Sequence, residues 1–242
     1  MTKKTSFGGK LYTGLVFLFL YAPIAVLILF SFNSGKSTAV FEGFSLHWYE
    51  ELFRDAATLT AFKNSLIIAV VSSIISTVMG TAAATAIYGY KNKLVKSSIM
   101  TVTNIPMMNP EIVTGIAMML LFVFIGGMFG KTGTLGFTTL TIAHVTFELP
   151  YVILNVLPKL KQTDAHLSEA AQDLGCTPAK AFLKVVLPSI TPGIVTGFIM
   201  AFTLSLDDFV ISYFTCGHYQ TMPIVIYNMT KKTVTPDVYA LC

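Results

Sequence analysis

Charged side chains are scarce in this sequence. Only 12% of the 242 residues are Asp, Glu, Lys or Arg, whereas 54% are hydrophobic. Soluble domains usually carry about 25% charged residues, because their surface must face water. The shortage of charge argues against a soluble protein and indicates an integral membrane protein.

Cysteine is also scarce, and Cys176, Cys216 and Cys242 form no CxxC pair. The sequence therefore predicts neither a metal site nor a redox site. A basic patch interleaved with aromatic residues is missing as well, so the net charge of +4 does not indicate nucleic-acid binding.

A nucleotide-binding P-loop is absent. The stretch "GGMFGKTG" resembles one, but the pattern G-x-x-x-x-G-K-[ST] requires a glycine five residues before Gly130, and Ile125 stands there. The stretch also lies in a predicted outer loop and not in a strand-to-helix turn. We therefore expect no enzyme activity from this chain, and a partner must supply any ATP hydrolysis.

Long apolar runs are what the sequence does contain. A helix of about 20 apolar residues crosses a hydrocarbon core about 30 Å thick. The first run is too long for a signal peptide, and no small-x-small cleavage site follows it. The sequence predicts five spans, at residues 11–32, 62–88, 99–124, 135–157 and 190–214.

The distribution of basic residues predicts a cytoplasmic N-terminus. That orientation puts ten of the 16 Lys and Arg residues inside and six outside, with the short loop "KNKLVK" contributing most.

The outer stretch "FSLHWYEELFRD" predicts a short amphipathic surface helix, with Trp48 and Tyr49 at the membrane interface. Pro236 and the apolar residues after it are interpreted as the start of a truncated sixth span. We expect one transmembrane domain over residues 1–242.

A polar helical stretch, "SEAAQDLGCTPAKAFLKVVLP", interrupts the apolar runs in the predicted cytoplasmic loop at 159–188. Gly175 suits a helix C-cap, Thr177 an N-cap, and Pro178 the first position of a second helix. The stretch therefore predicts a helix, a tight turn and a second helix. An ordinary amphipathic loop helix is the alternative to a docking surface.

Four carboxylates lie within or near the predicted spans, whose interiors contain no Lys or Arg to pair with them. Each would cost roughly 2.5–3.5 kcal/mol at a helix centre facing lipid. They must face a cavity, bind a cation or be protonated. A cationic substrate is the simplest explanation, and a polyamine is a linear polycation that several spaced carboxylates could hold. The candidate substrate-pathway residues are Glu111, Glu148, Asp207 and Asp208.

Local structure offers alternatives for each acid. Residues 109–111, Asn-Pro-Glu, suit a helix start that would break the third run near its middle. The two adjacent aspartates point about 100° apart on a helix, so only one is expected to face the pathway, or both snorkel to the headgroups. Glu148 follows His144 by four residues, and a local hydrogen bond between them is preferred to a substrate contact. His144 is interpreted as a packing residue and not as a metal ligand.

Two glycines, Gly193 and Gly197, form a G-x-x-x-G pattern in the last apolar run. Such a pattern allows two membrane helices to approach closely. The contact is expected either within this chain or with a second membrane subunit.

The spacing in the cytoplasmic loop resembles the EAA motif of ABC importer permeases. That pattern is EAA, three residues, Gly, nine residues, Ile, one residue and Leu-Pro; here Val185 replaces the isoleucine. The resemblance implies that this loop docks on a cytoplasmic ATPase as a coupling helix. The matching residues are Glu169, Ala170, Ala171, Gly175, Leu187 and Pro188.

Three further stretches, "FSLHWYEELF", "NPEIV" and "FTLSLDDFVIS", are similar to the PotC-type permeases of spermidine/putrescine importers. The resemblance implies an all-α, type I ABC importer transmembrane domain with six spans that works by alternating access in the cell membrane. It implies a PotB-type second permease, a PotA-type ATPase pair that binds ATP and Mg, and a soluble PotD-type polyamine-binding protein. The chain itself would need no cofactor. Glu148 departs from the family pattern, which puts its role in doubt.

Other functions remain as alternatives. The same machine could carry iron, thiamine or an inorganic anion, although four acids disfavour an anion. An ion-coupled secondary carrier would use the acids as proton or sodium sites, but it has no need of a loop that docks an ATPase. A structural membrane subunit would use them for packing.

Overall fold

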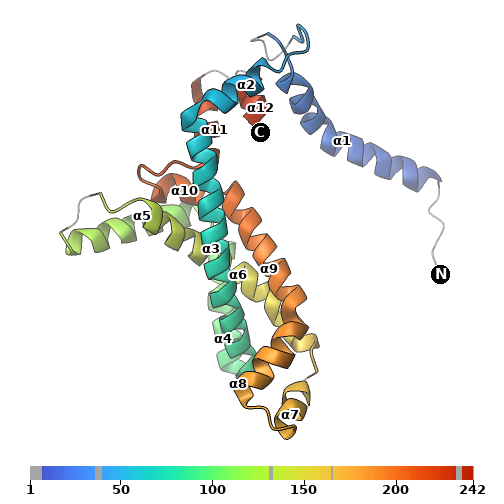
Figure 1. The fold of residues 1–242 in the computed structure, drawn as a ribbon, viewed down its shortest axis with the longest axis vertical. Helices are drawn as coiled ribbons and strands as arrows, with labels where there is room; N and C mark the ends of the chain where they lie inside the picture. The colour runs from blue at the N-terminus through green and yellow to red at the C-terminus, as the bar shows by residue number, and fades with distance from the viewer. Residues whose placement is uncertain (1–6, 36–39, 131–132, 165, 233–235, 242) are drawn as a thin grey trace. The chain divides into compact units, whose positions relative to one another are not determined.

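The chain is helical throughout the part that the computed structural model describes, residues 7–35, 40–130, 133–164, 166–232 and 236–241 (Figure 1). Apart from one isolated bridge between Asn33 and Phe44, no β-structure occurs in these ranges. The predicted all-α class is therefore confirmed. The elements are α1 (Phe7–Ser31), α2 (His47–Arg54), α3 (Ala56–Gly89), α4 (Lys93–Met108), α5 (Glu111–Met128), α6 (Phe137–Gln162), α7 (His166–Asp173), α8 (Pro178–Ala181), the π-helix η1 (Phe182–Val186), α9 (Leu187–Asp207), α10 (Val210–Thr215), α11 (Met222–Lys232) and α12 (Pro236–Leu241).

Five helical segments in the described ranges are long and apolar enough to cross a membrane, which agrees with the predicted number. Their bounds are Gly8–Ser31, Ala56–Gly89, Glu111–Met128, Phe137–Gln162 and Pro178–Asp207. By contacts the chain divides into two compact units, residues 1–60 with 225–242, and residues 61–224. The expectation of one domain stays a prediction.

The larger unit is built on the packing of α6 against α9. A Cβ added to Gly193 would lie 2.9 Å from Lys159 Cβ, and one added to Gly197 would lie 3.3 Å from Val152 Cγ1. The G-x-x-x-G pattern therefore allows close helix packing within this chain. The core beside it is aliphatic: Ala84 and Ile87 of α3, Val152, Ile153, Val156, Leu157 and Leu160 of α6, and Ile190 and Ala201 of α9.

The third predicted span is two helices, α4 and α5. Asn109 has an extended backbone, with φ −77° and ψ 143°, because the residue before a proline is disfavoured in the α region. The break predicted from residues 109–111 is confirmed, but the residue that precedes the new helix is Pro110 and not Asn109. The apolar run over residues 99–124 is thus divided between α4 and α5.

The fifth predicted span also ends early. α9 stops at Asp207, Asp208 has an extended backbone with φ −66° and ψ 118°, and α10 begins at Val210. A continuous helix over residues 190–214 is therefore a wrong prediction. The carboxylate of Asp208 accepts hydrogen bonds from the backbone N–H groups of Ile211 and Ser212, so it caps α10.

The loop at 159–188 has the predicted helix, turn and helix. Gly175 ends the first helix with φ +86°, a left-handed conformation that glycine adopts without a Cβ penalty. Thr177 Oγ1 accepts a hydrogen bond from the Lys180 N–H at 3.4 Å, and Pro178 is the first helical residue. The capping residues read from the sequence therefore act as expected.

A π-helical turn, η1, joins this loop to α9. Pro188 lies just beyond it and cannot donate to the carbonyl of Lys184, and its ring crowds that same carbonyl. Widening the preceding turn relieves this crowding, since a π turn bonds across five residues and not four. The Leu-Pro end of the loop motif therefore explains the π turn that precedes it.

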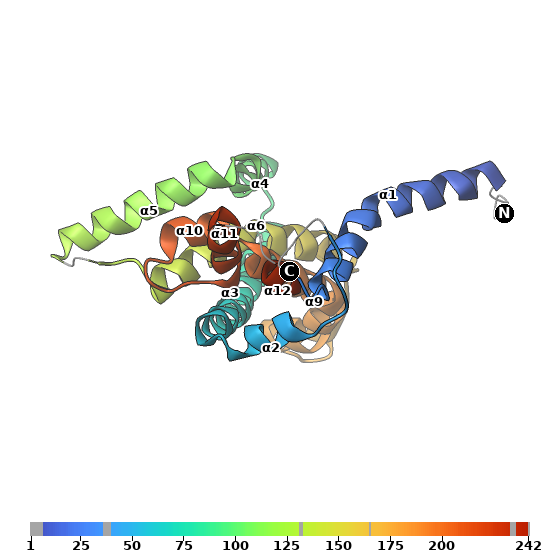
Figure 2. The same cartoon turned by 90° about the horizontal axis from the view of Figure 1, so that it is seen from above.

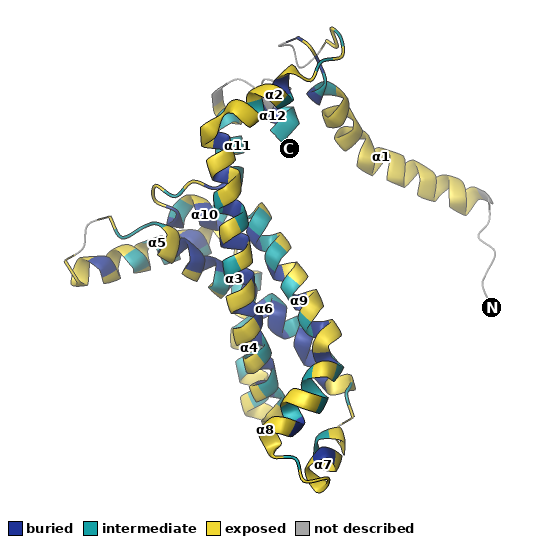
Figure 3. Cartoon of the chain, in the orientation of Figure 1, coloured by how far each residue is buried: buried dark blue, intermediate teal, exposed yellow. Residues whose placement is uncertain are grey.

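The smaller unit contains α1, α2 and α12. α1 is exposed from Gly8 to Leu29, as the yellow ribbon in Figure 3 shows, and only its last turn is covered. α2 is the predicted short amphipathic helix, but its Trp48 is buried and not placed at an exposed interface. The indole Nε1 of Trp48 donates to the carbonyl of Asn33 at 2.7 Å, which fixes α2 to the segment after α1.

Candidate functional site

A cavity of about 220 Å³ in the larger unit collects three of the four predicted acids. It lies where two helix breaks meet, because Glu111 begins α5 and Asp207 ends α9. Its lining combines carboxylates with aromatic and aliphatic side chains: Glu111, Phe147, Thr203, Leu204, Asp207, Asp208, Phe209 and Val210.

Close packing of α5 on α10 brings these two breaks together, and Figure 2 shows α5 lying along α10. Gly115 makes this approach possible, since a Cβ there would lie 2.9 Å from Phe214 Cδ2. One turn before Gly115, the first residue of α5 carries its carboxylate into the cavity lining. Gly115 therefore allows α5 to lie close enough to α10 for Glu111, at the start of α5, to line the cavity.

The two adjacent aspartates have different surroundings. Asp207 is exposed. The side chain of Asp208 is only 4% exposed, and its oxygens accept from the N–H groups of Ser212 at 2.7 Å and Ile211 at 3.3 Å. The oxygens of Asp208 are thus engaged by the start of α10, whereas Asp207 is open to a ligand.

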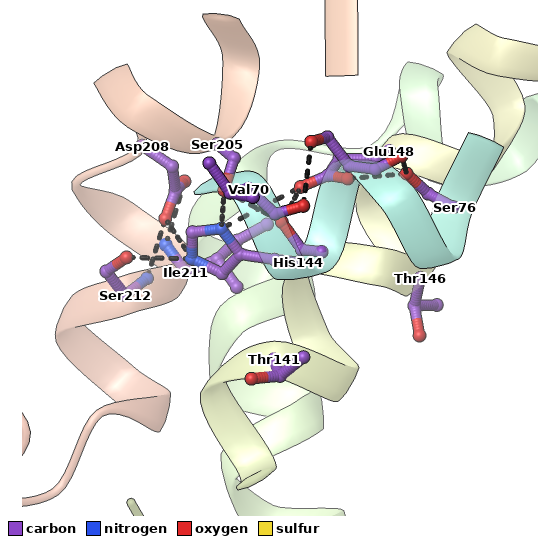
Figure 4. A network of polar contacts seen from close by, with 12 residues as sticks. Val70, Ser76, Thr141, His144, Thr146, Glu148, Ser205, Asp208, Ile211 and Ser212 are labelled. Carbon is purple, nitrogen blue, oxygen red and sulfur yellow. Dashed lines mark hydrogen bonds and ion pairs between the residues drawn. The ribbon is translucent and has the colours of Figure 1, made fainter. Parts of the chain in front are cut away.

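Glu148 does not line the cavity. It is fully buried in α6, where Ser72 Oγ donates to its Oε1 at 2.6 Å and Ser76 Oγ donates to its Oε2 at 2.7 Å (Figure 4). Both serines belong to α3. The carboxylate therefore joins two helices in the described structure, and its predicted place in the substrate pathway stays a prediction.

The expected local hydrogen bond between His144 and Glu148 does not form. His144 Nδ1 is 4.0 Å from Glu148 Oε1, but it is 2.7 Å from Ser205 Oγ, and Nε2 is 2.9 Å from Ser212 Oγ. Tertiary partners therefore replace the partner one turn away. His144 is buried, as predicted for a packing residue, but it also joins polar groups of three helices.

Hydrogen-bond donation along this network runs in one direction. A serine hydroxyl has one hydrogen, and that of Ser72 goes to Glu148. Ser205 must then donate to Ser72, at 3.1 Å, and His144 Nδ1–H must donate to Ser205. The single hydroxyl hydrogen of Ser212 has two acceptors within reach, His144 Nε2 and the carboxylate of Asp208.

Sequence reasoning did not identify the serines of this network. The signal was available in part, because Ser72 and Ser76 are four residues apart and therefore lie on one face of α3. That face must satisfy a buried acid from another helix. The contributions of Ser205 and Ser212 depend on the break after α9, which the sequence did not predict.

The residues predicted to couple to an ATPase begin in α7, and most of them around the turn after it are exposed. Glu169, Ala170 and Gly175 are exposed, whereas Ala171 is buried. Leu174, which the motif does not include, is 87% exposed and adds an apolar contact to the same surface. His166 Nδ1 is 3.0 Å from Glu169 Oε2, and this hydrogen bond raises the pKa of His166.

Comparisons with known proteins agree with these features. The sequence profile of the family described as "Binding-protein-dependent transport system inner membrane component" matches residues 76–240. The putrescine transport system permease protein PotI of Escherichia coli K12 is 38% identical over 226 residues, which cover 93% of this chain and 80% of the relative. The spermidine/putrescine transport system permease protein PotC of Haemophilus influenzae is 37% identical over 227 residues, covering 93% and 86%.

Solved structures share the fold. A chain of a bacterial ABC transporter involved in the import of the acidic polysaccharide alginate superposes with a TM-score of 0.75 at 16% identity, over 97% of this chain and 86% of the other. A bacterial alginate ABC transporter in complex with an alginate pentasaccharide-bound periplasmic protein gives a TM-score of 0.71 at 16% identity, over 96% and 85%. At this identity the likeness establishes the fold alone.

Proposed function

This chain belongs to the family of binding-protein-dependent transport system inner membrane components, and on that premise we propose that it moves polyamines across the cell membrane. It is a non-catalytic permease subunit of an ABC importer, as its relatives are. Two of those relatives are named as permeases for putrescine, or for spermidine and putrescine.

The acid-lined cavity is the observation that carries the choice of substrate. Its lining includes Glu111, Asp207 and Asp208 and no Lys or Arg. A polyamine is a flexible chain of methylene groups with ammonium groups at intervals. Carboxylates hold the ammonium groups by charge-assisted hydrogen bonds, and Phe147 and Phe209 offer faces for cation–π contacts and methylene packing.

The acids take different roles in this proposal. Glu111 and Asp207 contact the substrate directly, because both are exposed at the cavity. Asp208 shapes the cavity wall by capping α10. Glu148 acts through the packing of α3 against α6 and does not touch the substrate in the described conformation.

The cytoplasmic loop transmits the motion of a partner ATPase. The exposed surface of Glu169, Ala170, Leu174 and Gly175 is its proposed contact, and η1 connects that contact to α9. This assignment places the N-terminus in the cytoplasm. ATP and Mg bind to the ATPase pair of PotA type, beside a PotB-type second permease and a PotD-type soluble polyamine-binding protein.

Uptake measurements test this function. The chain is expressed with its partner subunits in cells that lack other polyamine importers, and uptake of labelled putrescine and spermidine is measured. We expect uptake that stops on ATP depletion and survives collapse of the proton gradient. Cells without this chain serve as the control.

Two results would contradict the proposal. Uptake that follows the proton gradient and ignores ATP would indicate a secondary carrier. ATP-driven uptake of another solute that polyamines do not inhibit would keep the ABC importer and remove the polyamine.

A further inference from the structure

A buried polar network of His144, Ser72, Ser205, Ser212 and Glu148 lies beside the cavity, and binding of substrate by the cavity acids does not by itself account for it. We propose that His144 is a positioning residue for the cavity: by holding Ser212, whose backbone N–H the carboxylate of Asp208 accepts, it fixes the start of α10 and directs the neighbouring Asp207 into the cavity. This inference rests on the proposed function, because Asp207 matters only if it meets the substrate.

His144 is the link between the two sides of the break. It is 2% exposed and lies on α6, which packs against both α9 and α10. Its Nδ1 contacts Ser205 of α9 at 2.7 Å, and its Nε2 contacts Ser212 of α10 at 2.9 Å. One rigid imidazole therefore sets the distance between the last turn of α9 and the first turn of α10 (Figure 4).

Asp208 depends on this arrangement. Its Oδ2 lies 3.5 Å from His144 Nε2 and accepts the Ser212 N–H at 2.7 Å. The helix that it caps, α10, has only six residues, too few to be stable without external contacts. Because Asp207 and Asp208 share a peptide bond, fixing the carboxylate of Asp208 also fixes the backbone that aims Asp207.

The other end of the network anchors α9. Ser205, one turn before the break, contacts Ser72 at 3.1 Å, and Ser72 donates to Glu148. Hydrogen bonds arranged in a chain strengthen one another in a low-dielectric interior. α9 is therefore held against α3 and α6 while His144 holds α10, so the break between them keeps one geometry.

Two substitutions of His144 separate these contacts. The amide of Asn reaches roughly as far as Nδ1, and the amide of Gln reaches roughly as far as Nε2. His144→Gln therefore keeps the contact with Ser212, whereas His144→Asn keeps only the contact with Ser205. We expect His144→Gln to support nearly normal maximal uptake and His144→Asn to lose about tenfold or more, the scale of one buried hydrogen bond whose partner is left unsatisfied.

A second measurement needs no transport. Asp207→Cys is combined with each His144 variant in the assembled complex, and the rate at which the introduced cysteine reacts with a cationic thiol reagent is measured. The labelling rate of the same complex without the introduced cysteine is subtracted as background. We expect fast labelling with His144 or Gln at this position and a clear loss of labelling with Asn. If the unaltered complex transports no polyamine, the proposed function fails, and this labelling still tests the positioning.

Ser73→Ala is the matched control. Ser73 is fully buried on the same face of α3 as this network, yet its hydroxyl bonds only to Val70 of its own helix in the contacts described. We expect normal uptake and assembly in this variant. Equal behaviour of the Asn and Gln variants, or uptake that falls only in proportion to the amount of assembled complex, would overturn the proposal.

Discussion

At the scale of single residues, two neighbouring aspartates show how context assigns a role. Asp207 and Asp208 are chemically identical, and the sequence alone predicted only that one of them would face the pathway. The oxygens of Asp208 are occupied by two backbone N–H groups of α10, while Asp207 is exposed at the cavity. Exposure at the cavity and helix capping are thus divided between adjacent carboxylates, and the proposed substrate contact falls to Asp207.

Removing each charge should distinguish these roles. Asp207→Asn removes one charge-assisted hydrogen bond to an ammonium group, worth roughly 1.5–3 kcal/mol, so polyamine transport should weaken about 10- to 150-fold. Asp208→Asn keeps a carbonyl oxygen that accepts the Ser212 N–H and should lose much less, whereas Asp208→Ala removes the cap and should lose more than Asp208→Asn. Uptake of labelled putrescine by the assembled importer is the measurement.

An exposed acid outside the cavity is the control for that series. Glu50→Gln on α2 changes the same net charge and should leave uptake unchanged. Normal uptake in Asp207→Asn would show that this carboxylate is structural, and the case for a polycationic substrate would then rest on the relatives alone.

At the scale of helices, the sequence was informative where local chemistry decides the structure. Gly175, Thr177 and Pro178 predicted the turn in the cytoplasmic loop, because capping depends on a few neighbouring residues. The Asn-Pro pair predicted the break before α5 for the same reason.

The break after α9 has a local signal that was missed, because Asp208 caps α10 through the N–H groups three and four residues on. The contact of His144 with Ser212 is tertiary and could not be predicted from local sequence. In an apolar run, periodicity predicts that the helix continues. The cavity itself was predictable as a set of acids but not as a meeting of two breaks, since Gly115 and Phe214 are far apart in sequence.

The turn after α7 gives a prediction at this scale. Gly175 has φ +86°, so any side chain there is strained, by roughly 1–2 kcal/mol, and a bulky one also blocks the docking surface. Gly175→Leu should abolish transport and stimulation of the partner ATPase, although the spans still insert. Gly175→Asn should retain more activity, because Asn tolerates left-handed conformations better.

Membrane insertion and ATPase activity should be followed together in these variants. Full uptake in Gly175→Leu would remove the docking role of this loop. Equal losses in the Asn and Leu variants would indicate that the absence of a side chain, and not the backbone conformation, is what matters.

At the scale of the whole molecule, orientation decides which partners each surface meets. The positive-inside count predicts that the loop with α7 and α8 lies in the cytoplasm, together with the N-terminus. Cys176 lies in the turn between these helices as a partly exposed free thiol, whereas Cys216 is buried. The chain therefore carries its own reporter of topology.

Labelling of Cys176 tests the orientation. A membrane-impermeant thiol reagent should react with it in inverted membrane vesicles and not in intact cells. The reaction is measured as the difference between the natural chain and Cys176→Ser, which removes any contribution from the other cysteines. Labelling in intact cells would reverse the topology and place the loop away from a cytoplasmic ATPase.

The π turn at η1 changes how positions on either side of it are counted. A π turn contains one more residue than an α turn, so a helical wheel drawn continuously from Pro178 into α9 misplaces every later residue by about 100°. Deleting one residue within Phe182–Val186 would restore an unbroken α-helical register and would rotate the coupling loop about the axis of α9. The nine residues between Gly175 and Val185 therefore set the rotation of the loop about the axis of α9, and with it the side of α9 to which the loop is attached.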